Sequence, residues 1–337
     1  MITSSDCEGA GEVFTISSNS DQKPADGKAQ TAEHFFKDRK YLTVSAQLHL
    51  EALAQSVGKV WTLSPTFRAE KSDTPRHLSE FYMLEAEAAF ESDMDRVMDV
   101  VEDMLRSTAT ILAETKTVKE LLQLTRKKAQ EAESNNDDAH EAAVTSGVLE
   151  QRWKGLEQAN WPRITYDKAI EALHLAVAQN RTEFEHPVSY STGLQAEHER
   201  YLATTIGQGS PIFVTHYPRQ QKPFYMTPSI TSGKETVECF DLLVPDLCEL
   251  AGGSMREHRS KELVEAMRTH GLLKDNGEQT AHSDIGNMQW YIDLRKYGSV
   301  PHGGFGLGFD RLISYLTGVP NIRDVVAFPR WYGRCDA

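Results

Sequence analysis

The sequence predicts an α+β fold in which an antiparallel β-sheet is flanked by helices. Segments 61–70 and 81–90 alternate apolar and polar residues on either side of a short polar loop, which is typical of a hairpin. Segment 237–251 carries the turn signal Pro245-Asp246 between two strand-like arms and predicts a second hairpin. A strand of alternating glycines over 303–309 runs directly into an amphipathic helix.

The first alternating strand presents a polar face to one side of the sheet. Before it, residues 1–40 are turn-rich, and a strand over 41–47 leads into a helix over 48–60. Successive side chains of a strand point to opposite faces. The polar face of 61–70 carries Thr62, Ser64, Thr66, Arg68 and Glu70, and the apolar face carries Trp61, Leu63, Phe67 and Ala69.

The second alternating strand also divides its side chains between two faces. The polar loop before it holds Arg76 and His77. A helix begins soon after the strand, with Asp93 as its predicted cap. One face of the strand carries Phe81, Met83, Glu85 and Glu87, and the other carries Tyr82, Leu84 and Ala86.

Residues from about 107 to 160 are rich in Lys, Glu and Gln, with a polar break at 134–138. This composition predicts helices joined by a solvated loop, which we interpret as an insertion outside the core. A short strand over 161–166 follows, then a helix for which Asp167 is the predicted cap, and a buried strand over 211–217.

Composition narrows the classes of function. The 337 residues have 39% hydrophobic content, which is typical of globular chains, and no apolar run reaches membrane-spanning length. A net charge of -13 argues against broad, non-specific affinity for nucleic acid, although a local basic face remains compatible with it. The four cysteines have no C-x-x-C spacing, so we expect a reducing compartment and no zinc site.

Two acidic residues of the second hairpin form a candidate metal pair. If its arms pair, Asp241 and Glu249 point to one face, opposite each other, where a cation or a proton must relieve their repulsion. Paired carboxylates together with bound phosphate are a common way for proteins to hold Mg²⁺. The alternative is two exposed acids on a solvated face. The bare backbone of Gly252-Gly253 follows and ends near Arg256.

The glycine-rich strand ends in an arginine in the first turn of a helix. A cation there opposes the helix dipole, so Arg311 is easier to explain if it faces an anion or a flat ring. The alternative is a tight turn with a solvated arginine. The string matches neither a phosphate loop nor a dinucleotide-binding fingerprint. Together with the arginines of the first hairpin and the acidic pair of the second, this glycine-rich strand suits the binding of a nucleoside triphosphate that bends over an antiparallel sheet.

Two long strings resemble the motifs of a known enzyme family, the class II aminoacyl-tRNA synthetases. Pro65-Thr-Phe-Arg-Ala-Glu70 through Arg76-His77 to Glu80-Phe81 resembles motif 2, and Gly303-Gly-Phe-Gly-Leu-Gly-Phe-Asp-Arg311 resembles motif 3. Within the subgroup that serves aspartate, asparagine and lysine, the asparagine enzymes are most similar, as the strings 290–302, 41–47, 6–14 and 241–245 indicate. The resemblance covers nearly the whole chain except about 107–160.

The resemblance implies a role for individual residues. Arg68 and Arg311 would be catalytic, with Arg68 on the α-phosphate and Arg311 stacked on adenine opposite Phe81. Asp241 and Glu249 would hold Mg²⁺. The ATP site would comprise Arg68, Glu70, Arg76, His77, Leu78, Phe81, Glu249, Gly308, Phe309, Asp310 and Arg311, and the amino-acid pocket Glu8, Gln47, Glu85 and Arg256.

The resemblance also implies the substrates. ATP and L-asparagine would form asparaginyl-adenylate, and tRNA(Asn) would accept the amino acid. In the aspartate enzymes a lysine three positions after the equivalent of Gln47 pairs with the substrate carboxylate, whereas Leu50 stands here. A neutral amide substrate suits this change.

Family members carry an N-terminal anticodon-binding barrel and a dimer-building motif 1, and this chain resembles the region after both. We therefore expect a catalytic domain over 1–337, truncated at its N-terminus, from a family that is homodimeric. The ending Val325-Val-Ala-Phe-Pro-Arg330 resembles bacterial and mitochondrial members, so the expected compartment is the mitochondrial matrix, with the cytoplasm as the alternative.

Three other functions remain open at this point. The first is an aspartate-specific synthetase of the same fold, against which Leu50 counts. The second is an asparagine synthetase that forms aspartyl-adenylate without tRNA. The third is a non-catalytic module derived from a synthetase, which would be expected to lose the motif arginines that are present here at positions 68 and 311.

Overall fold

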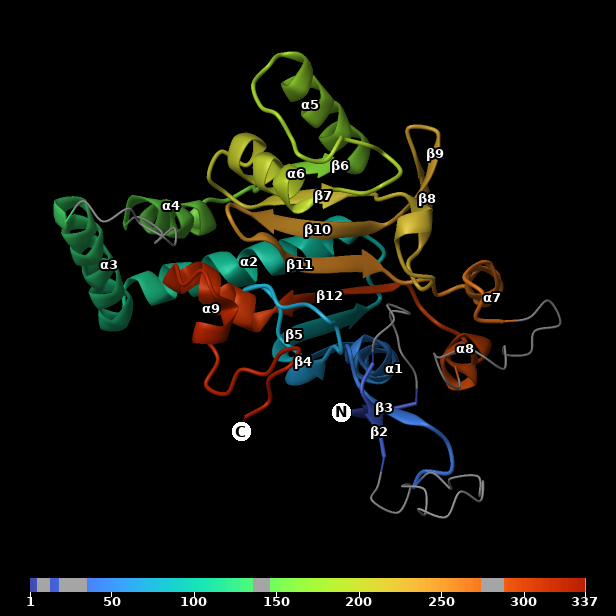
Figure 1. Cartoon of the computed structure of the whole chain (residues 1–337). Coiled ribbons are helices and arrows are strands. Elements are labelled where there is room, and N and C mark those ends of the chain that lie inside the picture. The colour runs from blue at the N-terminus through green and yellow to red at the C-terminus, as the bar shows by residue number, and fades with distance from the viewer. Residues whose placement is uncertain (5–12, 18–34, 136–145, 274–287, 337) are drawn as a thin grey trace, which may run out of the picture.

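The computed structural model of the chain describes residues 1–4, 13–17, 35–135, 146–273 and 288–336. Its centre is a seven-stranded sheet with the strand order β4-β5-β12-β11-β10-β7-β6 (Figure 1). Every neighbouring pair in the sheet is antiparallel except β6 and β7. The predicted α+β fold with an antiparallel sheet is confirmed.

The elements follow one another in an order that places distant segments side by side. The strands of the central sheet are β4 (Lys59–Phe67), β5 (Glu80–Ala89), β6 (Arg163–Thr165), β7 (Ile212–Thr215), β10 (Cys239–Val244), β11 (Cys248–Met255) and β12 (His302–Gly308). The helices are α1 (Gln47–Val57), α2 (Met94–Ala113), α3 (Lys116–Asn135), α4 (Ser146–Glu157), α5 (Tyr166–Ala178), α6 (Ala196–Tyr201), α7 (Ser260–Thr269), α8 (Gln289–Lys296) and α9 (Phe309–Thr317). A small sheet pairs β3 (Lys40–Leu42) with β1 (Ile2–Thr3) and β2 (Thr15–Ile16), and a hairpin joins β8 (Pro228–Thr231) to β9 (Lys234–Val237).

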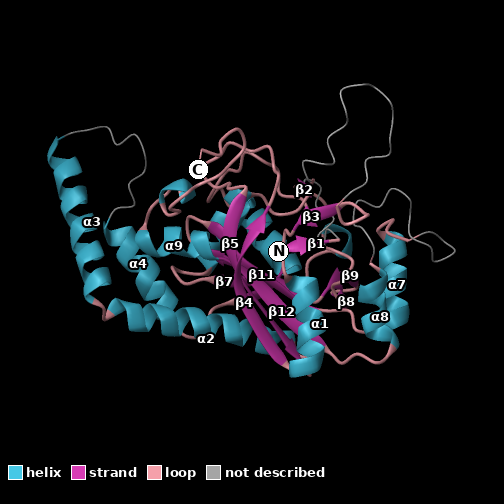
Figure 2. Ribbon diagram, turned by 90° about the horizontal axis from the view of Figure 1, so that it is seen from below, coloured by secondary structure: helices cyan, strands magenta, loops and turns pink. Residues whose placement is uncertain are grey.

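One face of the central sheet is apolar and is covered by α2 (Figure 2). Asp93 caps this helix as predicted, because its carboxylate accepts a hydrogen bond from the Asp95 N–H. The apolar side chains of α2 and those of the strands form one continuous core with α4 and α9. Its strand members include Phe213, Phe240, Leu242, Val244, Phe305 and Leu307.

The opposite face of the sheet carries the polar and charged side chains. The register of β4 with β5 pairs Thr66 with Phe81 and Thr62 with Glu85, which confirms the predicted division of faces. Strand β4 ends at Phe67, so Arg68 lies just beyond it, although its N–H still donates to Ser79 O. Side chains from β4, β5, β10 and β11 therefore converge on one surface.

The glycine alternation of β12 leaves this polar surface open. Leu307 and Phe305 belong to the apolar core, so Gly304, Gly306 and Gly308 face the other way. A side chain at Gly304 would collide with the carboxylate of Glu87, which occupies the space that the glycine leaves. The bare strand thus admits charged groups from its neighbours.

Two expectations about the middle of the chain were wrong. The described residues of 107–160 are mostly helical, but α4 does not lie outside the core, because Leu149 and Trp153 are buried within it. Within the described part of this segment, α3 extends away from the sheet (Figure 1). Helix α5 is capped by Thr165, whose hydroxyl accepts from the Lys168 N–H, whereas Asp167 pairs with Lys234.

Neighbouring valines on α2 test the packing of the core. Val101 is fully buried, whereas Val100 is 57% exposed on the same helix. Val101→Ala should lower the free energy of unfolding by about 2 kcal/mol more than Val100→Ala, because only the first change leaves a cavity. Both changes replace valine with alanine and alter helix propensity equally. The difference between their losses in free energy of unfolding therefore reports the burial of the Val101 side chain. Urea denaturation measures it, and equal losses would contradict this packing.

Candidate active site

A cleft runs along the polar face of the sheet. Its larger part is a cavity of about 500 Å³ whose wall includes Gln47, Glu85 and Arg256. A second cavity of about 190 Å³ adjoins it and is bounded by the loop between β4 and β5 and by the start of α9. Both cavities are lined by Arg68 and Glu249, so the two form one elongated site.

The smaller cavity brings together the residues of the two arginine-bearing motifs. The Arg68 guanidinium lies 5.5 Å from the centre of the Phe81 ring. Arg311 donates through Nη1 to Glu249 O at 3.0 Å, so its side chain extends over the end of β11. The Asp310 carboxylate accepts from the Tyr82 N–H at 2.7 Å and thereby joins the start of α9 to β5. An aromatic ring and two guanidinium groups here suit a nucleotide.

The β4–β5 loop supplies further polar side chains. His77 Nε2 lies 3.5 Å from the Glu70 carboxylate, and Arg76 donates to Asp246 O at 3.4 Å. The other predicted members Leu78, Gly308 and Asp310 also line the small cavity, and Leu78 is buried. Phe309 begins α9 but does not line either cavity as described.

The two carboxylates of the candidate metal pair share one face but are not opposite each other. A bulge between Leu242 and Leu243 shifts the register, so Asp241 pairs with Gly252, and Glu249 pairs with Leu243. A side-chain carbon at Gly252 would lie 3.3 Å from Asp241 Oδ1 and 3.3 Å from Glu249 Oε1. The glycine therefore keeps the space between the carboxylates open.

In the part of the chain that the structure describes, no three or more His, Cys, Asp or Glu side chains are grouped to hold a metal ion. The pair at positions 241 and 249 could bind a divalent metal only with oxygen ligands from elsewhere, such as phosphates or water. Lys222 Nζ now donates to Asp241 Oδ2 at 2.8 Å and stands 4.0 Å above the Tyr217 ring. No hydrophobic period or motif around Lys222 had indicated that it would lie in the site.

A third carboxylate approaches the pair from α6. Glu199 lines a recess of about 200 Å³ together with Arg76 and Glu249. Burial, and then the nearby carboxylates of Glu249 and Asp241, raise the pKa of Glu199 to about 7. Desolvation and the Asp241 carboxylate likewise raise the pKa of Glu249. The local field therefore favours cations at this end of the cleft.

The larger cavity contains the predicted amino-acid residues that the structure describes. Glu85 is buried and accepts from Ser45 Oγ at 2.5 Å and from the Ala46 N–H at 2.9 and 3.0 Å. Burial raises the pKa of Glu85, and these hydrogen bonds offset part of the rise. Leu50 is also part of the wall. Glu8 lies outside the described residues.

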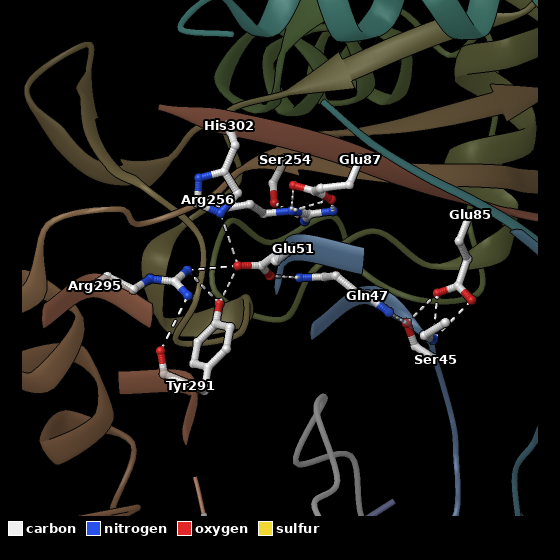
Figure 3. A network of polar contacts seen from close by, with 11 residues as sticks. Ser45, Gln47, Glu51, Glu85, Glu87, Ser254, Arg256, Tyr291, Arg295 and His302 are labelled. Atoms are coloured by element: carbon white, nitrogen blue, oxygen red, sulfur yellow. Dashed lines mark hydrogen bonds and ion pairs between the residues drawn. The ribbon is translucent and has the colours of Figure 1, made fainter. Parts of the chain in front are cut away.

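Arg256 pairs with Glu87, which the sequence placed on the same strand face as Glu85 but which was not predicted as a site residue. Its Nη2 lies 3.1 Å from Glu87 Oε2, its Nη1 donates to Ser254 Oγ at 2.5 Å, and both charged groups are buried (Figure 3). Glu87 follows Glu85 by two residues on β5, so the two side chains point to the same face of the sheet. The alternation of the strand therefore already indicated that Glu87 could reach the site. Burial raises the pKa of Glu87 to about 7, and Arg256 opposes that rise.

Comparison with known proteins places this arrangement in context. The sequence family described as tRNA synthetases class II (D, K and N) matches residues 1–332. The mitochondrial asparagine–tRNA ligase of Saccharomyces cerevisiae is 43% identical over 335 residues, which cover 98% of this chain and 62% of that protein. The asparagine–tRNA ligase of Microcystis aeruginosa is 41% identical, with 98% of this chain and 64% of that protein covered.

Solved structures give the same relationship. Asparaginyl-tRNA synthetase from Pyrococcus horikoshii, complexed with asparaginyl-adenylate, superposes with a TM-score of 0.74 at 32% identity over 99% of this chain and 62% of that chain. The enzyme from Entamoeba histolytica gives 0.71 at 28% identity, covering 100% of this chain and 62% of that chain. This chain thus spans less than two thirds of the length of these relatives. None of its described helices is both long enough and apolar enough to cross a membrane.

Two glutamates on α6 should respond to pH in opposite directions. The raised pKa of Glu199 means that its stabilising contribution is complete below the ordinary value of 4.5 and is lost as pH rises through about 7. Hydrogen bonds from the His186 and Glu185 N–H groups lower the pKa of Glu197 to about 2, so its contribution is present above 4.5 and is lost as pH falls through about 2.

At pH 8 without divalent metal, Glu199→Gln should therefore stabilise the protein by about 2 kcal/mol, whereas Glu197→Gln should destabilise it. At pH 4 the gain from Glu199→Gln should largely disappear. Thermal denaturation of both variants across this pH range provides the measurement. A pH-independent effect of Glu199→Gln would show that neither burial nor the neighbouring carboxylates raise the pKa of Glu199.

Proposed function

Because this chain belongs to the class II tRNA synthetases of the D, K and N type, we propose that it activates L-asparagine with ATP and transfers it to tRNA(Asn). The observation that carries the proposal is the cleft itself, in which a nucleotide-sized recess joins a polar cavity containing Arg256 and Glu85. Relatives at 43% and 41% identity are asparagine–tRNA ligases by name, which supports asparagine as the amino acid.

ATP would occupy the smaller cavity. Adenine would stack between Phe81 and Arg311, with Glu70 reading its amino group, and Arg68 would neutralise the α-phosphate. Arg76 and His77 line the same cavity and suit the terminal phosphates. A fixed guanidinium beside the phosphorus stabilises the charge that develops as the carboxylate attacks.

Asp241 and Glu249 suit Mg²⁺, because both are oxygen donors on either side of the space above Gly252. When bound there with ATP, the ion would neutralise phosphate charge and orient the leaving pyrophosphate. Lys222 would have to share or release Asp241, which it contacts in this structure. These carboxylates otherwise repel each other, so a cation at this position is favoured.

Asparagine would lie in the larger cavity with its side-chain amide at Arg256. The guanidinium can donate to the amide oxygen, and the adjacent Glu87 carboxylate can accept from the amide nitrogen. Aspartate would instead place a carboxylate against Glu87 and would meet Leu50, where the aspartate enzymes have a lysine. Like charges facing each other in a desolvated pocket cost several kcal/mol. This is enough to favour asparagine over aspartate by about two to three orders of magnitude.

The reaction needs no nucleophile from the protein. The carboxylate of asparagine attacks the α-phosphorus of ATP, pyrophosphate leaves, and a terminal ribose hydroxyl of the tRNA then attacks the activated carbonyl. Arg68 and Arg311 contribute by positioning and by charge. AMP leaves from the activated carbonyl, and the proton of the ribose hydroxyl passes to the phosphate of the departing AMP.

We also propose that the protein is a homodimer of the mitochondrial matrix, with the cytoplasm as the alternative compartment. An apolar cavity of about 490 Å³ between β4 and α2 is lined by Trp61 and Val100, which are 72% and 57% exposed. Exposed apolar patches of this kind are typical of subunit contacts. The yeast relatives at 43% and 38% identity are named as mitochondrial, which supports the compartment.

Amino-acid-dependent exchange of pyrophosphate into ATP tests the proposed function. The protein should support exchange with asparagine at least about a hundredfold better than with aspartate. Arg68→Ala should lower the rate by at least about a hundredfold, because one preorganised charge at the phosphate is lost. Its melting temperature should stay near that of the wild type, because Arg68 lies beyond the end of β4.

Lys116→Ala, on α3, is the control and should leave exchange unchanged, since its side chain is 89% exposed and lines neither cavity. Equal rates with the two amino acids would contradict the asparagine assignment. Normal exchange by Arg68→Ala would contradict the phosphate role.

A further inference from the structure

The carboxylate of Glu51 is buried beneath the amino-acid cavity and is surrounded by donors (Figure 3). Its Oε2 accepts from Tyr291 Oη and Arg295 Nη2, both at 2.7 Å, and lies 3.1 Å from His302 Nε2. Although burial raises it, Arg295 and then His302 hold the pKa of Glu51 well below its usual range. The group is therefore an anion, and an ionised carboxylate can only accept hydrogen bonds.

The remaining oxygen of this carboxylate faces Gln47, one helical turn earlier on α1. Gln47 Nε2 lies 3.1 Å from Glu51 Oε1. The amide oxygen and nitrogen of a glutamine are interchangeable in shape, so only the hydrogen-bond partners decide which one faces which way. Because Glu51 cannot donate, the nitrogen must face Glu51. The carbonyl oxygen is then the end of the amide that is left for the cavity, whose wall includes Gln47.

We propose that Glu51 is a positioning residue that fixes the amide of Gln47 with its carbonyl oxygen toward the cavity, where it accepts a hydrogen bond from the α-ammonium group of the amino-acid substrate. This inference rests on the proposed function and deepens it. Without Glu51, the amide of Gln47 could turn and present its N–H groups, which would repel an ammonium ion instead of binding it.

The surroundings of Gln47 fit a cation. Glu85 lines the same cavity, and its carboxylate has acceptor positions beyond those used by Ser45 and Ala46. The Ser45 hydroxyl also accepts a hydrogen bond from the Gln47 N–H at 3.0 Å. Because the same hydroxyl donates to Glu85, it links the first turn of α1 to the Glu85 carboxylate. Two acceptors, one neutral and one charged, would thus face the ammonium group from adjacent positions.

The other hydrogen-bond partners of Glu51 lead away from the substrate cavity. Arg295 extends away from the cavity and donates through Nε to Glu257 O at 3.1 Å, and His302 Nδ1 lies 2.8 Å from Val300 O. Neither of these contacts lines the substrate cavity. Among the described residues, Gln47 is the hydrogen-bond partner of Glu51 that lines the cavity. The charge of Glu51 also acts on Arg256 and Glu87, without a hydrogen bond to either that the structure shows.

The experiment compares asparagine with succinamate, which has the same amide and carboxylate but lacks the α-amino group. The wild-type protein is first tested for asparagine-dependent pyrophosphate exchange and for inhibition by succinamate. Glu51→Gln should raise the KM for asparagine about tenfold, because a charged hydrogen bond is lost. The KM for ATP and the inhibition constant of succinamate should change less than about twofold.

A double-mutant cycle shows whether Glu51 acts through Gln47. In the background of Gln47→Leu, which cannot bind the ammonium group whatever its orientation, Glu51→Gln should have no further effect on the KM for asparagine. Tyr291→Phe is the matched control, since it removes one donor to Glu51 without touching Gln47, and it should leave the KM unchanged. If Glu51→Gln does not fold, Glu51→Asp replaces it, because it keeps the buried anion and withdraws the oxygen from Gln47.

Each outcome decides one point. Absence of asparagine-dependent exchange in the folded wild-type protein would contradict the proposed function itself. Exchange by the wild type, combined with equal losses for asparagine and succinamate in the Glu51 variants, would overturn this inference alone. An undiminished effect of Glu51→Gln in the Gln47→Leu background would overturn it as well. Selective loss of asparagine binding that disappears in that background would support it.

Discussion

The absence of side chains along one face of β12 is the constraint on which the site depends. Gly304 gives its space to the carboxylate of Glu87, and Gly306 lies against the side chains of Met83 and Glu85. Groups from β5 can therefore reach across the strand toward β11. Any side chain at Gly304 would displace Glu87, the carboxylate that pairs with Arg256. The buried ion pair between Glu87 and Arg256 therefore requires glycine at position 304.

Charged side chains that are buried against the sheet need partners of opposite charge. Arg256 is bound by Glu87, and Glu51 is bound by Arg295 and His302. Breaking such a buried pair from one side typically costs about 3–5 kcal/mol, because the remaining charge is left without a partner. The same pairing fixes the direction of each donor and acceptor before substrate arrives. This is the preorganisation that a reaction driven by positioning and charge requires.

Local periodicity was enough to predict part of this arrangement. The alternation of β4 and β5 placed Thr66, Phe81 and Glu85 on the correct face, and Asp93 was the correct cap. The resemblance to known motifs predicted the remaining residues that we propose for the ATP site. Local patterns could not reveal contacts between distant positions: Glu51 and Arg295 are 244 residues apart, and Lys222 reaches Asp241 from a separate loop. The bulge in β10 that offsets Asp241 from Glu249 had no turn residue to mark it.

The most direct test of the account is a crystal structure with a non-hydrolysable sulfamoyl analogue of asparaginyl-adenylate. The account predicts adenine between Phe81 and Arg311, the side-chain amide within hydrogen-bond distance of Arg256 and Glu87, and the α-ammonium group on Gln47 Oε1. An analogue bound outside the cleft, or bound with its ammonium group at Arg256 and its amide elsewhere, would contradict it.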